Sequence, residues 1–279
     1  MYSKVRVINL EMNVSLACNL KCEYCSHFGR YMKGIIPVED LSSWYKTWNQ
    51  KIVPNNVRVM GGEPLLHPDI VEIIRMTRND WPDSSVELLT NGLMIAKMQE
   101  PFFSVIRENG VNVLISHHFD DPEFNRIFDA GVNLLKFHGI EPHVLQCNWF
   151  WAKSYRLNEV GQAVPFRSIP EKAWQNCFVK GYCTTLLDNK LYCCPQLGCA
   201  AYARKMGYIG ADWDIVFEYQ PLLPECSHEE LESFIHQGGC QQCCICPEVF
   251  EYADMYQKLN VFGLHQFKKI FCGECHESH

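Results

Sequence analysis

The first half of the chain alternates short apolar runs with amphipathic segments. From Leu10 to Leu16 apolar residues occupy every second position, which predicts a strand leading into a cysteine-containing loop. Further strands are predicted at residues 57–60, 86–89, 111–116 and 143–147, and helices from Pro37 onward and at residues 69–78, 101–108 and 122–138. Strands that alternate with helices predict an α/β fold with a parallel sheet. Five strands are recognisable by about residue 150, without an evident sixth.

The second half has a different pattern. Residues 186–192 predict a β-hairpin with its turn at Asp188-Asn189, and this hairpin ends at the adjacent Cys193 and Cys194. A Cys-x2-Cys-Cys-x-Cys run follows at residues 240–246. No internal repeat and no low-complexity segment is evident.

Length and composition restrict the class of protein. The 279 residues suffice for one large domain, or for one large and one small domain, and the apolar fraction of 47% is typical of a globular protein. The net charge of −7 argues against a nucleic-acid partner. Neither a membrane-spanning apolar run nor a signal peptide is present. We therefore expect a cytoplasmic protein without membrane attachment, whose sixteen cysteines serve metal or redox chemistry rather than disulfides.

The most informative cysteines are Cys18, Cys22 and Cys25, in the order Cys-x3-Cys-x2-Cys. Three thiolates so close in sequence can hold three irons of a [4Fe–4S] cubane and leave the fourth iron open to a small molecule. Zinc sites and ferredoxins also use three-cysteine loops, but they tend to supply a fourth ligand nearby. Here the next cysteine is Cys147.

The residues around this loop sharpen the interpretation. With Tyr24 before the last cysteine, the loop resembles the signature of radical S-adenosylmethionine (radical SAM) enzymes. Residues 60–64, Met-Gly-Gly-Glu-Pro, resemble the family motif that contacts the SAM amino group, where glycine lets the backbone approach the ligand. Residues 89–92 resemble the polar end of the third strand, and residues 115–116 the position of a hydroxyl near the ribose. The resemblance implies that SAM is bound by Tyr24, Gly61, Gly62, Glu63, Asn91 and Ser116.

The resemblance also implies a fold and an initiating reaction. It implies a partial (β/α)6 barrel over residues 1–170, with the motifs at the C-terminal ends of strands, where α/β barrels place their chemistry. The open iron would chelate SAM, and an electron from the cluster would cleave it to methionine and a 5′-deoxyadenosyl radical. An electron donor such as flavodoxin or ferredoxin is implied as a partner.

The cysteines of residues 171–279 resemble a Twitch domain, a shortened SPASM domain, which is a small α+β unit holding an auxiliary [4Fe–4S] cluster. The match assigns as its ligands Cys177, Cys194, Cys240 and Cys243. Cys193 competes with Cys194, which is favoured because it precedes Pro195. One auxiliary cluster is expected, although the leftover Cys246, Cys272 and Cys275 leave that number open. Zinc, or no metal at all, remains an alternative.

Two further features stay open. The tail segment Cys272-Gly-Glu-Cys275-His276 has the spacing of a haem attachment site, but no export signal is present. A solvated end is favoured over a metal site of Cys272, Cys275, His276 and His279. His117 and His118 follow Ser116 at the expected barrel mouth, where they would contact substrate or serve the structure.

For the reaction we expect oxidation or other radical remodelling of a small polar metabolite, such as a sugar or aminocyclitol. The alternative is crosslinking or epimerisation of a peptide, disfavoured because no room precedes Cys18 for a peptide-recognition domain. An epimerase would need a thiol that returns hydrogen, and the spare cysteines are Cys147, Cys183, Cys199 and Cys226. A purely structural or sensory role for the clusters is the remaining hypothesis. It would leave SAM uncleaved.

Overall fold

The computed structural model describes residues 3–147, 151–177 and 179–253. Its main sheet has seven strands in the order β10-β9-β1-β2-β3-β4-β5. Five of them are mutually parallel and follow the predicted order: β1 (Val5–Ser15), β2 (Ile52–Gly61), β3 (Ser85–Thr90), β4 (Asn112–His117) and β5 (His143–Gln146). The connecting helices are α1 (Val38–Trp48), α2 (Ile70–Asp80), α3 (Glu100–Glu108) and α4 (Pro122–Phe137). The predicted α/β fold is confirmed.

Strand β1 begins earlier than its apolar alternation predicted. Val5 and Val7 are buried, but they stand at odd positions, whereas Leu10 and Met12 stand at even ones. No single period of two therefore covers the whole strand. Val5, Val7, Leu10, Met12 and Val14 share one apolar core with buried residues of the other strands and of helices α1–α4.

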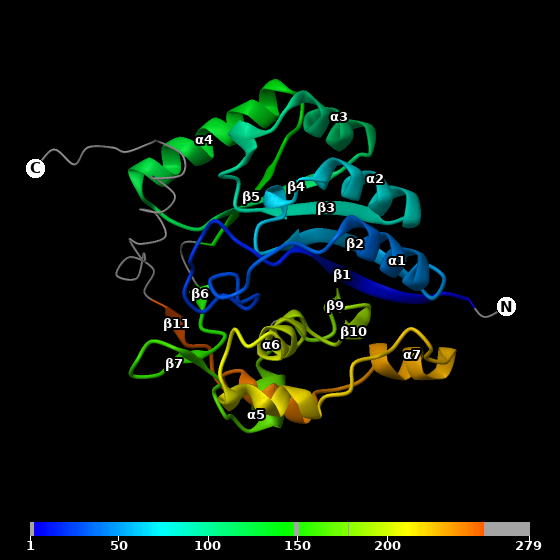
Figure 1. Cartoon of the computed structure of the whole chain (residues 1–279), viewed down its shortest axis with the longest axis vertical. Helices are drawn as coiled ribbons and strands as arrows, with labels where there is room; N and C mark the ends of the chain where they lie inside the picture. Colours follow the sequence, from blue (N-terminus) through cyan, green and yellow to red (C-terminus); the bar gives the residue numbers. More distant parts are fainter. Residues whose placement is uncertain (1–2, 148–150, 178, 254–279) are drawn as a thin grey trace, which may run out of the picture.

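The second half of the chain lies in the lower part of the view, beneath the β1–β5 units (Figure 1). It contains α5 (Pro170–Gln175), α6 (Pro195–Lys205) and α7 (His228–Ile235). Short 3-10 helices are η1 (Pro64–Leu66), η2 (Ile95–Lys97), η3 (Ala211–Glu218) and η4 (Gln241–Ile245). Two small antiparallel pairs join β6 (Trp151–Ala152) to β11 (Tyr252–Ala253), and β7 (Arg156–Leu157) to β8 (Ala163–Val164).

The predicted hairpin consists of β9 (Cys183–Leu187) and β10 (Lys190–Tyr192). Asp188 and Asn189 both have φ of +55°, which suits a tight two-residue hairpin turn. β9 pairs in parallel with β1 and is thus the sixth parallel strand of the sheet, on the side of β1 away from β2. The cysteine-rich half therefore extends the sheet of the first half, and a domain boundary at residue 170 stays a prediction. In the parts of the chain described, no helix has the length and apolar character needed to cross a bilayer.

Candidate active site

Residues 16–28, which contain Cys18, Cys22 and Cys25, are called the cysteine loop. This loop begins where β1 ends and is held against the end of β2. The Gly62 N–H donates to the Ser15 carbonyl at 2.7 Å, and the Glu63 N–H donates to the Ala17 carbonyl at 2.9 Å. On its other side, the Ala17 N–H donates to the Gly34 carbonyl at 2.9 Å. Two motifs that are separate in sequence are thus joined through their backbones at the C-terminal edge of the sheet.

This contact itself requires glycine at two positions. A Cβ on Gly61 would stand 2.0 Å from the Ser15 carbonyl oxygen, and a Cβ on Gly62 would stand 2.3 Å from the Ala17 oxygen. Gly61 also has φ of +142°, which disfavours other residues. We expected glycine here for the approach of a ligand. The backbone of the cysteine loop already demands it.

The cysteine loop turns through two residues in the left-handed region. Tyr24 has φ of +59° and Phe28 has φ of +53°, and each such non-glycine residue costs about 1 kcal/mol or more. The strain is offset by packing, because both side chains are buried and their rings lie 5.6 and 5.3 Å from the Tyr155 ring. The loop conformation therefore depends on a residue from the second half of the chain.

The three thiols of the loop fit an iron–sulfur cluster in their chemistry. Burial raises the pKa of Cys18 and Cys22, and the carboxylate of Glu63 raises that of Cys18 further. Cys25 and Cys18 raise the pKa of Cys22, so the three sulfurs are close enough to repel one another as thiolates. The positive charge of iron would reverse that balance.

Backbone N–H groups already surround two of these sulfurs. The Leu20 N–H donates to Cys18 Sγ at 3.4 Å. Burial raises the pKa of Cys25, although the N–H groups of Gly29, His27 and Phe28 hydrogen-bond to it and lower the value in part. Hydrogen bonds to sulfur are among the features by which proteins set the potential of such clusters.

Glu63 is fully buried and joins three elements. Its Oε1 accepts from the Leu65 N–H at 3.0 Å and from Thr90 Oγ1 at 2.6 Å, and its Oε2 accepts from the Asn91 N–H at 2.9 Å. Burial nevertheless raises its pKa to about 7. Thr90 was not predicted as a site residue, although its place at the polar end of β3 was a signal. The carboxylate thus fastens the end of β3 to η1, beside the cysteine loop.

Asn91 completes the connection between β3 and the loop. Its Nδ2 donates to Asn19 Oδ1 at 2.7 Å and lies 3.9 Å from Cys18 Sγ, while its Oδ1 accepts from the Leu93 N–H at 3.1 Å. The predicted residues Glu63 and Asn91 are therefore brought together with Cys18. Whether either contacts SAM stays a prediction.

Ser116 and the two histidines lie at the ends of β4 and β5. The Ser116 hydroxyl hydrogen-bonds to the Cys147 thiol, whose pKa burial raises. His117 Nε2 is 2.8 Å from Asn125 Oδ1, and its ring packs 4.7 Å from that of Phe128, which favours a structural role. Burial and the neighbouring His117 lower the pKa of His118 to about 4, so that imidazole is neutral at pH 7.

The sheet face opposite the apolar core is polar. We call this set the polar face: Asn9, Glu11, Asn13, Asn56, Arg58, Glu87, Cys183 and Thr185. Arg58 Nε donates to Glu87 Oε2 at 2.7 Å, and Arg58 Nη1 lies 3.8 Å from Glu11 Oε1. Glu11 Oε2 lies 3.6 Å from Nε2 of His27, which belongs to the cysteine loop. The polar face thus reaches the loop, and its charges were not predicted because no local motif marks them.

Several cysteines of the second half lie near one another, and their assignment as cluster ligands stays a prediction. Cys240 Sγ lies 4.0 Å from Cys243 Sγ. Cys240 shares hydrogen bonds with Cys193 and Cys243, which lower the pKa of Cys240 and raise the pKa values of its two partners. Burial raises the pKa of Cys177, and the nearby Cys194 raises it further. Among the residues described, no three His, Cys, Asp or Glu side chains are placed to hold a single ion.

The competition between Cys193 and Cys194 stays open. Cys193 hydrogen-bonds to Cys194 and Cys240. The charge of Cys194, in turn, raises the pKa values of Cys177, Cys243 and Cys246. Cys246 is half-buried and donates to Gln196 Oε1 at 3.4 Å. Cys272, Cys275, His276 and His279 lie outside the described residues.

The spare thiols have different surroundings. Cys183 lies 3.8 Å from Arg58 on the polar face. Cys199 on α6 is fully buried, and this burial raises its pKa. The charges of Glu11, Cys25 and Cys194 raise the pKa further. Cys226 lies beside Lys51, whose Nζ donates to its carbonyl at 2.9 Å. Of the four, Cys147 is the one at the C-terminal edge of the sheet.

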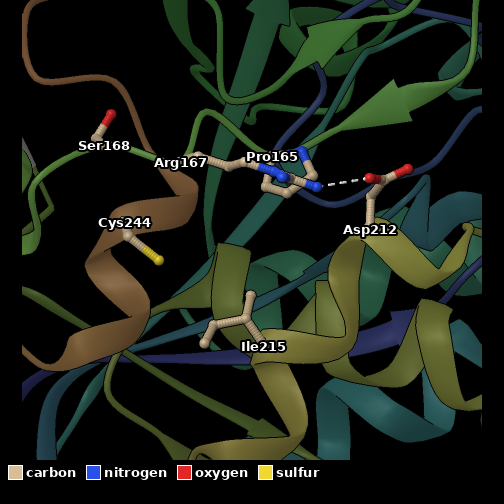
Figure 2. Close-up of a pocket in the computed structure, with 6 residues that line it drawn as sticks. All are labelled: Pro165, Arg167, Ser168, Asp212, Ile215 and Cys244. Atoms are coloured by element: carbon tan, nitrogen blue, oxygen red, sulfur yellow. Dashed lines mark hydrogen bonds and ion pairs between the residues drawn. The ribbon is translucent and has the colours of Figure 1, made fainter.

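A pocket of about 360 Å³ lies between η3, η4 and the segment before α5 (Figure 2). Arg167 and Asp212 form an ion pair of 2.8 Å along it, and the Cys244 sulfur points into it. The other residues that line it are Pro165, Ser168 and Ile215. None of the side chains predicted from sequence as cluster ligands or SAM contacts lines this pocket.

Fold and site together define an α/β core with three neighbouring cysteines at the C-terminal edge of its sheet. Residues 12–136 match the model of the Radical SAM superfamily. This matched segment contains the cysteine loop, Glu63 and Asn91, so this part of the chain is similar to the radical SAM superfamily. Members of this superfamily use a [4Fe–4S] cluster and SAM.

Curated relatives match about half of the chain. The chain is 32% identical over 143 residues to a probable GTP 3′,8-cyclase of Methanococcus aeolicus, covering 49% of this chain and 46% of the relative. It is 27% identical over 132 residues to the GTP 3′,8-cyclase of Aquifex aeolicus, covering 45% of this chain and 40% of the relative. The chain thus spans less than half the length of these relatives.

Two solved structures are similar in fold. BtrN in complex with AdoMet and 2-DOIA matches 98% of this chain and 94% of its own, with a TM-score of 0.50 and 14% identity. The native anSMEcpe with bound AdoMet and Cp18Cys peptide matches 50% of this chain and 42% of its own, with a TM-score of 0.41 and 23% identity. The likeness to BtrN extends the shared fold over the second half.

Proposed function

We propose that this enzyme cleaves SAM reductively and abstracts a hydrogen atom from a small polar substrate, which it oxidises or remodels. Cys18, Cys22 and Cys25 hold the SAM-binding cluster in this proposal, and Glu63 and Asn91 position SAM beside it. When bound, the cluster and SAM supply a carbon radical that attacks an unactivated C–H bond. The protein contributes the geometry and the exclusion of water.

The observation that carries the substrate class is the polar face. Glu11 and Glu87 flank Arg58 in one row across three adjacent strands, because these residues are partners in the parallel registers. Glu11 precedes Ser15 by four residues along β1. At about 3.3 Å per residue, the backbone of this row therefore lies about 13 Å from the start of the cysteine loop.

Arg58 and Glu87 are incompletely buried, with side chains 26% and 14% exposed. Their carboxylate and guanidinium groups can bind hydroxyl and amino groups of a sugar or aminocyclitol. Arg58 would hold the substrate oxygens by donating hydrogen bonds, and the carboxylates would accept hydrogen bonds from its hydroxyl or amino groups.

In the second half, Cys177, Cys194, Cys240 and Cys243 would ligate one auxiliary [4Fe–4S] cluster, with Cys193 in place of Cys194 as the alternative. Their convergence supports this assignment. Oxidation of an alcohol requires removal of a second electron after the hydrogen atom, together with a proton, and a four-thiolate cluster suits electron acceptance. A zinc ion in this place would have no such capacity.

The proposal is tested with anaerobically reconstituted enzyme, dithionite and SAM. The substrate panel consists of sugars, aminocyclitols and nucleotides, and includes GTP because of the names of the relatives. The expected result is 5′-deoxyadenosine together with a product lighter by two hydrogens. Replacement of Arg58 by Leu should raise KM for that substrate far more than for SAM.

Peptide modification is distinguished by the same measurement in deuterated water. An epimerised peptide keeps the number of its hydrogens and takes up one deuterium at a stereocentre. Cys147 is the spare thiol that lies at the edge carrying the other motifs. Deuterium incorporation that is lost in Cys147→Ala would refute the oxidation proposal and favour epimerisation.

A further inference from the structure

One segment of the chain lies between two groups of cysteines. The first group is in the cysteine loop, and the second group comprises Cys177, Cys193, Cys194, Cys240 and Cys243. It comprises residues 153–156 and is held on one side by Glu251, whose carbonyl accepts from the Lys153 N–H at 2.8 Å and whose carboxylate lies 3.2 Å from Arg156. On its other side the Tyr155 ring packs on the rings of Tyr24 and Phe28 in the cysteine loop. The segment is therefore fixed against both halves of the molecule.

Hydrogen bonds run through this segment from one cysteine group to the other. Ser154 Oγ donates to the carbonyl of Tyr24, which lies between Cys22 and Cys25. The Ser154 carbonyl accepts from Gln196 Nε2. Gln196 Oε1 in turn accepts from Cys246 Sγ at 3.4 Å.

The last step of this path reaches the second group directly. The Cys246 N–H donates to the Cys243 carbonyl at 3.1 Å. Gln196 is only 8% exposed, so both ends of its amide depend on these partners rather than on water. Cys199, one helical turn further along α6, is fully buried and lies near Cys25 and Cys194. The path is therefore a continuous run of hydrogen bonds and covalent bonds between the two groups.

We infer that Gln196, with Ser154, is the link through which an electron passes between the auxiliary cluster and the SAM-binding cluster. The inference rests on the proposed function, because it requires an auxiliary cluster in the second group of cysteines. Hydrogen bonds and covalent bonds couple redox centres more strongly than an equal distance through space. Gln196 is a positioning residue in this role, because it contacts none of the proposed cluster ligands directly. It reaches the second group through Cys246.

The electron count makes the inference measurable. Each cleavage of SAM removes one electron from the SAM-binding cluster and yields methionine and, after hydrogen abstraction, 5′-deoxyadenosine. An enzyme with both clusters reduced, and then freed of dithionite, holds a second electron on the auxiliary cluster. Passage of that electron oxidises the auxiliary cluster, reduces the SAM-binding cluster again and permits a second cleavage.

The experiment adds SAM to the doubly reduced, dithionite-free enzyme and follows two quantities. Freeze-quench EPR measures the signal of the reduced auxiliary cluster, and chromatography measures 5′-deoxyadenosine. We expect the wild type to lose the auxiliary signal while a second equivalent of product forms. In Gln196→Leu the first equivalent should form as in the wild type, whereas the auxiliary signal should persist and the second equivalent should be lost.

Two further variants make the result specific. Thr77→Val is the matched control, because Thr77 is also a buried polar side chain but donates to the Ile73 carbonyl within α2, outside the path. It should behave as the wild type. Ser154→Ala removes the hydrogen bond to Tyr24 and leaves α6 intact. It should reproduce the defect even if Gln196→Leu fails to load its clusters.

The outcomes separate the inference from the proposed function. Wild-type decay of the auxiliary signal in Gln196→Leu and Ser154→Ala, with both clusters present, would overturn the link alone. Persistence of that signal in the wild type would also overturn it. Iron near four atoms per wild-type chain, without an auxiliary signal, would refute the auxiliary cluster and the link with it.

Discussion

Glu63 allows a quantitative test of how the site is assembled. Its carboxylate has no exposed surface, and burial raises its pKa from 4.5 to about 7 in spite of three hydrogen bonds. The difference between folded and unfolded chain is thus about 2.5 pH units, which at about 1.4 kcal/mol per unit amounts to about 3 kcal/mol.

The sign of this contribution follows from proton binding. Between pH 4.5 and 7 the folded state keeps the Glu63 proton, which the unfolded state has already lost. Stability contributed by this proton is therefore complete below about pH 4.5 and lost as pH rises through 7. Ionised Glu63 therefore destabilises the folded state at neutral pH, unless a bound cation such as the SAM ammonium compensates its charge.

The assay is denaturant unfolding of the iron-free protein at pH 5 and pH 8, under anaerobic reducing conditions. From pH 5 to 8 the wild type should lose about 2.5 kcal/mol relative to Glu63→Gln, which cannot ionise. In Glu63→Gln the side-chain NH2 also faces an N–H or hydroxyl donor, which lowers the stability of this variant by about 1–3 kcal/mol at every pH. The matched control is Glu72→Gln, whose side chain is 56% exposed on α2 and which should keep the wild-type pH dependence. Parallel pH profiles for wild type and Glu63→Gln would refute the reasoning.

Three other predictions follow from the same site. Alanine at all three cysteines of the 18–25 loop should abolish 5′-deoxyadenosine and lower bound iron from roughly eight atoms to about four, and undiminished product would contradict the assignment. Gly62→Ala should destabilise the protein by about 1–3 kcal/mol in thermal unfolding, because its Cβ would stand 2.3 Å from a carbonyl oxygen. Gly210→Ala, with no atom near its Cβ, should change little, and equal melting temperatures would count against the packing argument. Arg58→Leu should lower stability by about 1–3 kcal/mol because Glu11 stays buried without its cation, and an unchanged melting temperature would show that the pair contributes nothing.

Local pattern in the sequence was sufficient for much of the fold. Periods of two and of 3.6 residues located β1–β5 and α1–α4, because those periods arise from backbone geometry within each element. The spacing of Cys18, Cys22 and Cys25 and the Gly-Gly-Glu turn indicated the cofactor chemistry, and the family match agrees. The hairpin at residues 183–192 was also evident, since its turn chemistry is local.

Long-range contacts decided the rest. Nothing local places β9 beside β1, because an apolar strand can pair with any exposed sheet edge. The polar face depends on that order, since Glu11, Arg58 and Glu87 meet only through the parallel registers. Ser154 and Gln196 carry no motif, and their role appears only when α6 folds against the cysteine loop. The sequence by itself determined the elements and the cofactor. Which side chains surround that cofactor was decided by tertiary packing, because hydrogen bonds across the molecule depend on distances in space rather than on separation along the chain.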